Sequence, residues 1–260
     1  MTFVDAKQRF SNRVLDYARY RPSYPCTLLD LLARECGLRP DHVITDIGSG
    51  TGLLTKLFLE HGNRVHGVEP NREMREGGQE FLRDYSGFTS IDASAESTTL
   101  PDSSVDFIVV GQAFHWFDAP AAQREFRRVL SPGGWCVVVW QDRRTEETPF
   151  AREYEDVLVR FGVDYKSVKD TYPEIEKMRA FFDSGSFHST DLPNHQDFDW
   201  NGLVGRLRSS SYAPTEQHAN YAPMINELRR IFGSYQQLNG TVRMDYFARV
   251  YFGKLGRNSQ

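Results

Sequence analysis

The heptapeptide DIGSGTG, which begins at Asp46, places three glycines between a short β-branched run and a helical pattern. Glycine lacks a Cβ and tolerates positive φ, so the backbone of Gly48, Ser49 and Gly50 can close on a nucleotide-like ligand. A dinucleotide fingerprint needs a glycine or alanine where this chain has Leu53, and a carboxylate below the loop would repel a pyrophosphate. Asp46 instead suits a ligand with an ammonium group and no phosphate.

A second carboxylate, Glu69, follows the next expected strand and lies 21 residues after Gly48. An acid at about this spacing accepts hydrogen bonds from ribose hydroxyls in nucleotide-binding sheets of this kind. An adenosine that carries a positively charged amino-acid tail is S-adenosylmethionine (SAM). The two acids and the glycine loop therefore predict SAM as the cofactor, and the opposing interpretation is a tight turn with a solvated acid.

Two further polar residues follow the apolar run 105–111. Gln112 lies where residues after a parallel strand face the crevice of the sheet, and we expect it to contact SAM or the substrate. His115 is the candidate general base, because an imidazole can take a proton from a hydroxyl or amine nucleophile. No orienting carboxylate is visible beside it, so a structural role stays open. Trp116 is expected either to pack in the core or to wall the sulfonium region.

These residues need a framework that brings strand ends together. Short apolar runs that predict strands occupy 42–47, 64–69, 88–92, 105–111 and 134–140. Helical patterns alternate with them at 27–36, 51–61, 72–85 and 118–130. Continuous apolar strands that alternate with helices predict a parallel sheet covered on both faces, which is a doubly wound α/β fold.

The alternation breaks after residue 140. Helical patterns appear at 148–161, 174–182 and within 214–233, a strand pattern at 186–192, and a period-two pattern at 241–252 that predicts a late antiparallel strand. No repeat or linker divides the chain, so we expect one domain over 1–260. Its expected parts are an N-terminal arm (1–26), a SAM-binding core (27–140), a helical insertion (141–185) and C-terminal strands with a helix (186–260). The arm and the insertion are expected to cover the substrate.

Composition excludes several classes of protein. The 31 basic and 35 acidic residues give a net charge of −4, which argues against a general nucleic-acid binder. No window approaches the run of about 18 apolar residues that a membrane span needs. The three cysteines have no metal-ligand spacing, so we expect free thiols, no metal and a cytoplasmic location.

In order and spacing the motifs resemble those of class I SAM-dependent methyltransferases. DIGSGTG is similar to their first motif and VEP (68–70) to the segment that follows it, and 92–117 and 124–140 continue the match. The pattern Y-x-x-x-R-P-x-Y-P at 17–25, QAFHWF at 112–117 and SSSYAP at 209–214 resemble a small-molecule subgroup of methyltransferase type 11-like enzymes, to which trans-aconitate-type enzymes are distantly related. The resemblance spans nearly the whole chain and implies a Rossmann-like, mostly parallel seven-stranded sheet.

The resemblance also implies roles for individual residues. Asp46 would bind the methionine ammonium directly or through water, Glu69 would hold the ribose, and Pro70 would lie against the adenine. Ala95 and Glu96 match the segment that edges the adenine. Many relatives have an acid before that alanine where this chain has serine, so the partner of the adenine amino group is either Glu96 or Asp92.

An aromatic and basic cluster in the N-terminal arm is the candidate substrate cover. Tyr17, Arg21 and Tyr24 either fix the arm through rings and prolines or cover the SAM site, with Arg21 available to pair with a substrate carboxylate. Tyr212 in the SSSYAP segment is a further candidate contact. Arginines at 143, 144, 206 and 208 could serve the same end, although solvated side chains are the default expectation for them.

The sequence thus predicts a methyltransferase that moves the methyl group of SAM to an oxygen, nitrogen or carbon atom of a small molecule. The expected partners are this acceptor alone, without nucleic acid or membrane, and the oligomeric state is left open. Two alternatives remain at this point. One is a nicotinamide-dependent oxidoreductase on a similar sheet, and the other is a SAM-binding protein without activity.

Overall fold

A computed structural model of the protein describes residues 19–165, 175–182 and 187–255. Its described strands form a seven-stranded sheet in the order β3-β2-β1-β4-β5-β7-β6. Strand β7 runs antiparallel to both neighbours, and the remaining pairs are parallel. The expected mostly parallel sheet with a late antiparallel strand is therefore confirmed. The strands are β1 (Val43–Ile47), β2 (Arg64–Val68), β3 (Phe88–Ile91), β4 (Val105–Gly111), β5 (Leu130–Arg143), β6 (Phe187–Phe198) and β7 (Val242–Gly253).

Helices cover both faces of this sheet. One face packs against α3 and α4, and the other against α6 and α9. Alternate residues of β5 divide between them: Val137 and Val139 face α3 and α4, whereas Val138 and Trp140 face α6 and α9. The helices are α3 (Thr27–Cys36), α4 (Leu53–His61), α5 (Arg72–Phe81), α6 (Ala119–Val129), α7 (Pro149–Phe161), α9 (Ile175–Phe181), α10 (Trp200–Arg208) and α11 (Tyr221–Tyr235), with a 3-10 turn at Phe114–Trp116.

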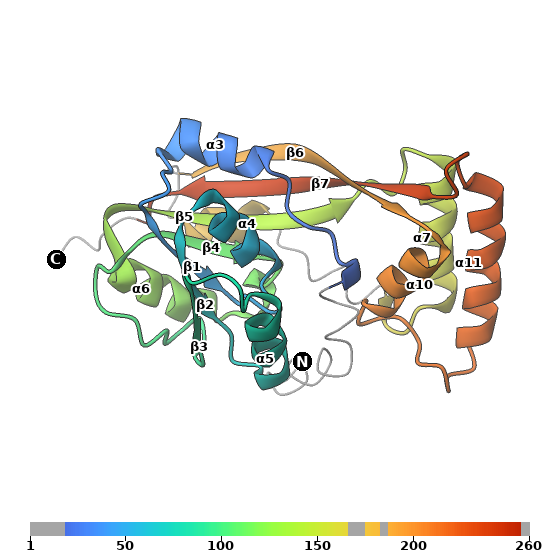
Figure 1. Cartoon of the computed structure of the whole chain (residues 1–260), viewed down its shortest axis with the longest axis horizontal. Helices are drawn as coiled ribbons and strands as arrows, with labels where there is room; N and C mark the ends of the chain where they lie inside the picture. Colours follow the sequence, from blue (N-terminus) through green and yellow to red (C-terminus); the bar gives the residue numbers. More distant parts are fainter. Residues whose placement is uncertain (1–18, 166–174, 183–186, 256–260) are drawn as a thin grey trace.

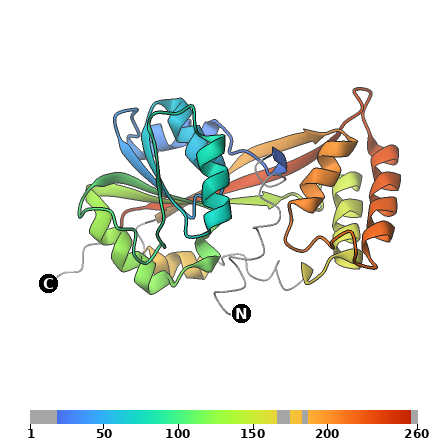
Figure 2. The same cartoon turned by 60° about the horizontal axis from the view of Figure 1, so that its bottom comes forward.

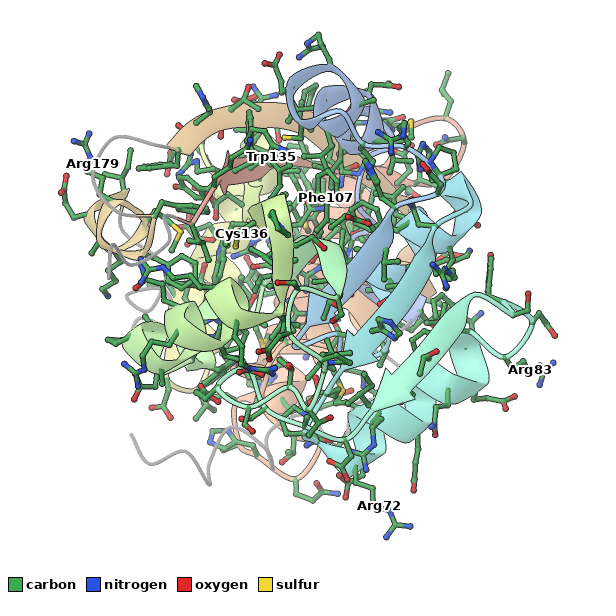
Figure 3. All side chains as sticks on the ribbon, turned by 90° about the vertical axis from the view of Figure 1, so that its left-hand side faces the viewer. Arg72, Arg83, Phe107, Trp135, Cys136 and Arg179 are labelled. Atoms are coloured by element: carbon green, nitrogen blue, oxygen red, sulfur yellow. The ribbon has the colours of Figure 1, made fainter. Side chains whose placement is uncertain are left out.

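The centre of the sheet is apolar and its periphery is charged. Phe107 of β4 pairs in register with Trp135 of β5, one residue before Cys136. Figure 3 shows the molecule from the end of the sheet that is opposite to α7, α10 and α11. In that view Phe107, Trp135 and Cys136 lie near the middle of the molecule. Arg72 and Arg179 project outward at the edges. The three cysteines are free, as their spacing predicted.

The last three strands run well beyond the others. Gly111, the final residue of β4, pairs with Val139, and β5 continues to Arg143. These four further residues extend about 13 Å past the end of β4. At the far end of β5, β6 and β7, helices α7, α10 and α11 form a separate group, which we call the cap (Figures 1 and 2). The cap has its own apolar core, which includes Leu158, Leu207 and Leu228.

The helical insertion expected at 141–185 divides between two places. Helix α7 joins the cap, whereas α9 packs on the core sheet, with Phe181 edge-on to Phe114 at 4.7 Å between ring centroids. Helix α10 was not expected from the sequence, because its nine residues bury only Leu203 and Leu207 among large apolar side chains. No helix in the described part of the chain is long and apolar enough to cross a bilayer.

The described end of the N-terminal arm is attached to the cap and to the long strands. The Tyr20 ring lies so close to Gly205 of α10 that a Cβ there would approach ring carbon Cε2 to 2.2 Å. Arg21 donates to the carbonyl of Ser209 at 2.9 Å, and the amide of Asn194 donates to the carbonyl of Ser23 at 2.7 Å. The arm therefore crosses from α3 to the cap at the end of the sheet where β1 and β4 finish (Figure 1).

Candidate functional site

The glycine loop turns tightly between β1 and α4. Gly48 and Gly50 adopt φ of +69° and +56°, in the left-handed region that favours glycine. A Cβ on Gly48 would lie 2.5 Å from the Cβ of Ala113, which excludes any other residue without movement of the backbone. The amides of Gly48 and Ser49 both donate to the carbonyl of Val68, at 2.9 and 3.1 Å. The loop is thus fixed to β2.

Asp46 lies under this loop with 1% of its surface exposed. Its Oδ2 accepts a 2.7 Å hydrogen bond from the Thr55 hydroxyl, and its Oδ1 has no partner among the described residues. Burial raises the pKa of the Asp46 carboxyl to about 7, against the hydrogen bond from Thr55, and the charge of Glu69 adds to the rise. A cation placed against Oδ1 would relieve both the missing partner and the desolvation.

Glu69 follows β2 and points back toward the loop. Its Oε2 accepts from the amide of Gly50 at 2.9 Å, and its Oε1 accepts from the amide of Asn71 at 2.8 Å. These bonds fix the orientation of the carboxylate. Pro70, beside it in the chain, is half-buried. The structure therefore brings Asp46, the loop and Glu69 together.

The segment expected to edge the adenine follows β3. Ala95 is buried, and Glu96 accepts a 3.0 Å hydrogen bond from the amide of Asp118 at the start of α6. Asp92 is exposed and forms a 2.8 Å ion pair with Arg75, a residue of α5 whose guanidinium also donates to the carbonyl of Glu69. Each acid thus already has one protein partner, and both remain candidates for the adenine amino group.

Gln112 occupies the first position after β4 in a strained conformation. Its φ of +57° is uncommon for a residue with a side chain, and such outliers cluster at functional sites. The side-chain amide donates to the carbonyl of Gln141 at 3.1 Å, which links β4 to the part of β5 that extends beyond it. Tyr24 of the arm lies directly over Gly111, where a Cβ would meet its hydroxyl at 2.3 Å. Gln112 and Tyr24 are therefore neighbours at the end of β4.

His115 lies in the 3-10 turn that follows, close to two indole rings. Its ring centroid is 4.2 Å from that of the half-buried Trp116 and 5.2 Å from that of Trp140. Its Nδ1 is buried without a partner among the described residues. Burial lowers the pKa of His115 to about 4, so the imidazole is neutral at physiological pH. A neutral imidazole can accept a proton or position a donor, but it is a weak base at this pKa.

The other substrate candidates lie on the cap side. Tyr212 is buried edge-on to Tyr165, with 4.7 Å between ring centroids, and Tyr17 lies outside the described residues. The default expectation of solvated arginines is wrong at two positions: Arg206 is 4% exposed, and the Arg143 side chain is 12% exposed. Sequence patterns missed these two because each burial depends on tyrosines that come from distant segments.

A cavity of about 430 Å³ lies along the outer part of β5 and β7 and is bordered by the 144–147 segment and Tyr165. Its wall includes Trp140, which contacts His115, and Arg143 and Tyr165 from the group around Tyr212. The volume is in the usual range for small-molecule sites. Among the described residues, no cluster of histidine, cysteine or carboxylate side chains has the size needed to hold a metal ion.

Comparison with known proteins gives a consistent picture. A family described as a methyltransferase domain matches residues 45–138. An uncharacterized methyltransferase of Mycobacterium tuberculosis is 30% identical over 236 residues, covering 90% of this chain and 89% of the relative. A solved structure described provisionally as a type II methyltransferase from Anaeromyxobacter dehalogenans is similar with a TM-score of 0.67 at 24% identity, covering 91% and 98% of the two chains. A phosphoethanolamine N-methyltransferase of Haemonchus contortus, solved with S-adenosylhomocysteine, is similar in fold with a TM-score of 0.54 at 16% identity, covering 95% of this chain and 59% of that one.

Proposed function

The chain belongs to the class I SAM-dependent methyltransferases, and we propose that it transfers the methyl group of SAM to an oxygen, nitrogen or carbon atom of a small molecule. Membership in this family excludes the nicotinamide-dependent alternative. The observation that supports the cofactor pocket best is the buried Asp46 Oδ1 without a partner, directly below a loop that only glycine can form. An ammonium group is the ligand that this atom fits.

The chain's own residues would divide the work of binding. Asp46 would pair with the amino group of SAM, and Gly48, Ser49 and Gly50 would leave room for its amino-acid tail. Glu69, fixed by two backbone amides, would accept from the ribose hydroxyls, and Pro70 and Ala95 would border the adenine.

Bound SAM supplies a methyl group already activated by the positive sulfur. The protein's task is then to hold the acceptor atom in line with that methyl group and to keep water away. Gln112, whose strained backbone is fixed to β5, would contact the methionine part or the acceptor. Trp116 would border the same region.

Thermal shift tests the pocket directly. We expect S-adenosylhomocysteine (SAH) and SAM to raise the melting temperature, and NAD to leave it unchanged. The shift should disappear in Asp46→Ala and in Glu69→Ala. Arg230→Gln is the control, because Arg230 is an exposed residue of α11 that pairs with Glu153 and Glu227. An unchanged shift in both pocket variants would refute the proposed cofactor site.

We propose His115 as the base only for acceptors that must lose a proton, since a carboxylate nucleophile needs none. Its pKa of about 4 keeps the imidazole neutral between pH 6 and pH 9. The titration of His115 should therefore cause no inflection in the pH profile of the rate over this range. We expect His115→Ala to lower kcat about 100-fold with little change in KM if it is the base. Retention of the full rate would remove this role.

The acceptor is proposed to be a small molecule because the cavity beside Trp140 has a volume of about 430 Å³ and is bordered by the cap. A cytoplasmic location is proposed because Cys26, Cys36 and Cys136 are all free thiols. Product analysis with methyl-labelled SAM would test the first point, since a protein or nucleic-acid acceptor would retain the label in precipitable material.

A further inference from the structure

Three arginines from different segments meet in the cap around one buried tyrosine. Arg21 comes from the arm, Arg143 from the end of β5 and Arg206 from α10, and the charges of all three act on the Tyr212 phenol. Burial alone would raise the pKa of Tyr212, but these positive charges outweigh it and hold the pKa below its usual value. The surroundings of Tyr212 are therefore strongly positive.

This positive charge is only partly balanced by protein carboxylates. Arg143 forms a 3.0 Å ion pair with Glu155, and the Tyr165 hydroxyl bridges the two side chains. Arg206 meets only hydroxyl groups among the described residues, with 2.9 Å to Ser210 and 3.3 Å to Tyr246. A buried guanidinium without a carboxylate is costly, which makes this group a ready partner for an anion.

Two polar atoms of the same group have no partner within the described part of the chain. They are Nη1 of Arg143 and the hydroxyl of Tyr154, a residue that is 2% exposed. The Arg143 guanidinium lies 5.3 Å from the centroid of the Tyr154 ring, so the two groups are neighbours. Buried polar groups are normally paired, and a pair of orphans beside excess positive charge indicates a ligand that accepts hydrogen bonds.

The cavity is bordered by residues of this group and by Trp140, a neighbour of His115. Arg143 and Tyr165 line one part of it, and Trp140, whose ring is 5.2 Å from that of His115, lines another. Arg143 lies four residues beyond the last β4–β5 pair, about 13 Å along the strand. An anion held at Arg143 is therefore distant from the end of β4, where the acceptor atom would react.

We propose that the acceptor carries a carboxylate at the end opposite to its nucleophile, that Arg143, which lines the cavity, holds this carboxylate, and that the buried Arg206 supports it with its charge. The proposal rests on the methyltransferase function above and adds the chemical class of the substrate. The middle of such a molecule would lie against the rings of Trp140, Phe247 and Tyr251, which also line the cavity. The remaining lining is charged on both sides: it includes Asp142, which pairs with Arg249, Glu147, which pairs with Arg144, and Glu146. A planar carboxylate matches the paired donors of a guanidinium.

The test uses hydroxyphenylalkanoic acids of increasing chain length, each paired with its neutral primary amide and with the matching phosphonate. Binding is measured by calorimetry with the full-length protein saturated with SAH. We expect at least one acid to bind at least about tenfold more tightly than its amide, and Arg143→Gln and Arg206→Gln to reduce this preference to less than about twofold. Arg143→Lys should restore part of it, and Arg230→Gln should preserve it.

The outcomes separate the two proposals. If SAH itself fails to bind, the proposed function is wrong. If SAH binds but acids and amides bind equally, or if the arginine variants keep the preference, the carboxylate inference is overturned. Preference for the phosphonate over the acid would also overturn it, in favour of a phosphate group. The comparison of acid with amide in the wild-type protein needs no variant, so it stands even if an arginine variant does not fold.

Discussion

The two ends of the candidate active site are built in different ways. At the cofactor end, backbone amides and glycines at positive φ form the surface, and a single buried acid provides the charge. At the cap end, the charge comes from long side chains of separate segments: Arg143 lines the cavity, and Arg206 is buried near Tyr212. A site made of backbone tolerates almost no substitution at its glycines, whereas a site made of side chains can change specificity without changing the fold.

The largest effect should come from a methyl group added to the glycine loop. Gly48→Ala combines positive φ with a 2.5 Å contact to Ala113, so we expect it to lower the free energy of unfolding by about 2–4 kcal/mol and to abolish SAH binding. Gly37→Ala is a close control, since Gly37 has φ of +68° and open space around a Cβ. It should cost about 1 kcal/mol and leave binding intact. If urea unfolding shows that the two variants lose the same free energy of unfolding, the tight contact at Gly48 is contradicted.

Asp46→Asn should separate stability from binding at the cofactor end. Because the pKa of Asp46 is raised in the folded protein, ionisation of its carboxyl lowers the free energy of unfolding. This loss begins as pH rises above the pKa of the same carboxyl in the unfolded chain, and it is complete above about pH 7. At pH 8 we therefore expect Asp46→Asn to stabilise the unliganded protein by about 1–3 kcal/mol while it weakens SAH binding about 100-fold. At pH 5 the stability difference should shrink. A variant less stable than the wild type at pH 8 would contradict this.

Cofactor affinity of the wild-type protein should depend on pH through the same group. The ammonium needs an ionised Asp46, and with a pKa of about 7 only about one molecule in ten is ionised at pH 6. Titration with SAH should thus give about tenfold weaker binding at pH 6 than at pH 8. The profile of Asp46→Asn should be flat over this range. A flat wild-type profile would show that Asp46 does not pair with the ammonium.

The smallest effect is expected where the arm meets the cap. Gly205→Ala would displace the Tyr20 ring, which belongs to a side chain and can move aside more easily than backbone atoms. We expect SAH affinity within about twofold of wild type, a loss of stability of about 1 kcal/mol and faster proteolysis of residues near Tyr20. The acid-over-amide preference should fall, since Gly205 immediately precedes Arg206 in α10. If the affinity for SAH falls by the same factor as the affinity for the acid, the cofactor end and the cap end of the site are not independent.

The same contrast explains what could be predicted from sequence. The strand–helix alternation predicted the sheet and both of its helical layers, and the spacing of Asp46, the glycine loop and Glu69 predicted residues that the structure brings together. These features depend on neighbours in the chain and on strand ends that a parallel sheet must align. The surroundings of Tyr212 depend on contacts across the chain, such as that between the arm and Ser209, 188 residues apart. Periodicity carries no information about such contacts, which is why Arg143 and Arg206 were expected in solvent.

The length of β5 and β7 also limits how this protein can move. Eight consecutive residue pairs, from Cys136 with Gly253 to Arg143 with Tyr246, join the two strands without interruption from the core into the base of the cap. A rotation of the cap would have to bend this ladder, because no flexible linker lies between the two parts along these strands. Entry of the cofactor and the acceptor is then expected to require release of the arm, held by the Tyr20 contact and the bonds to Ser23, rather than opening of two rigid bodies about a hinge.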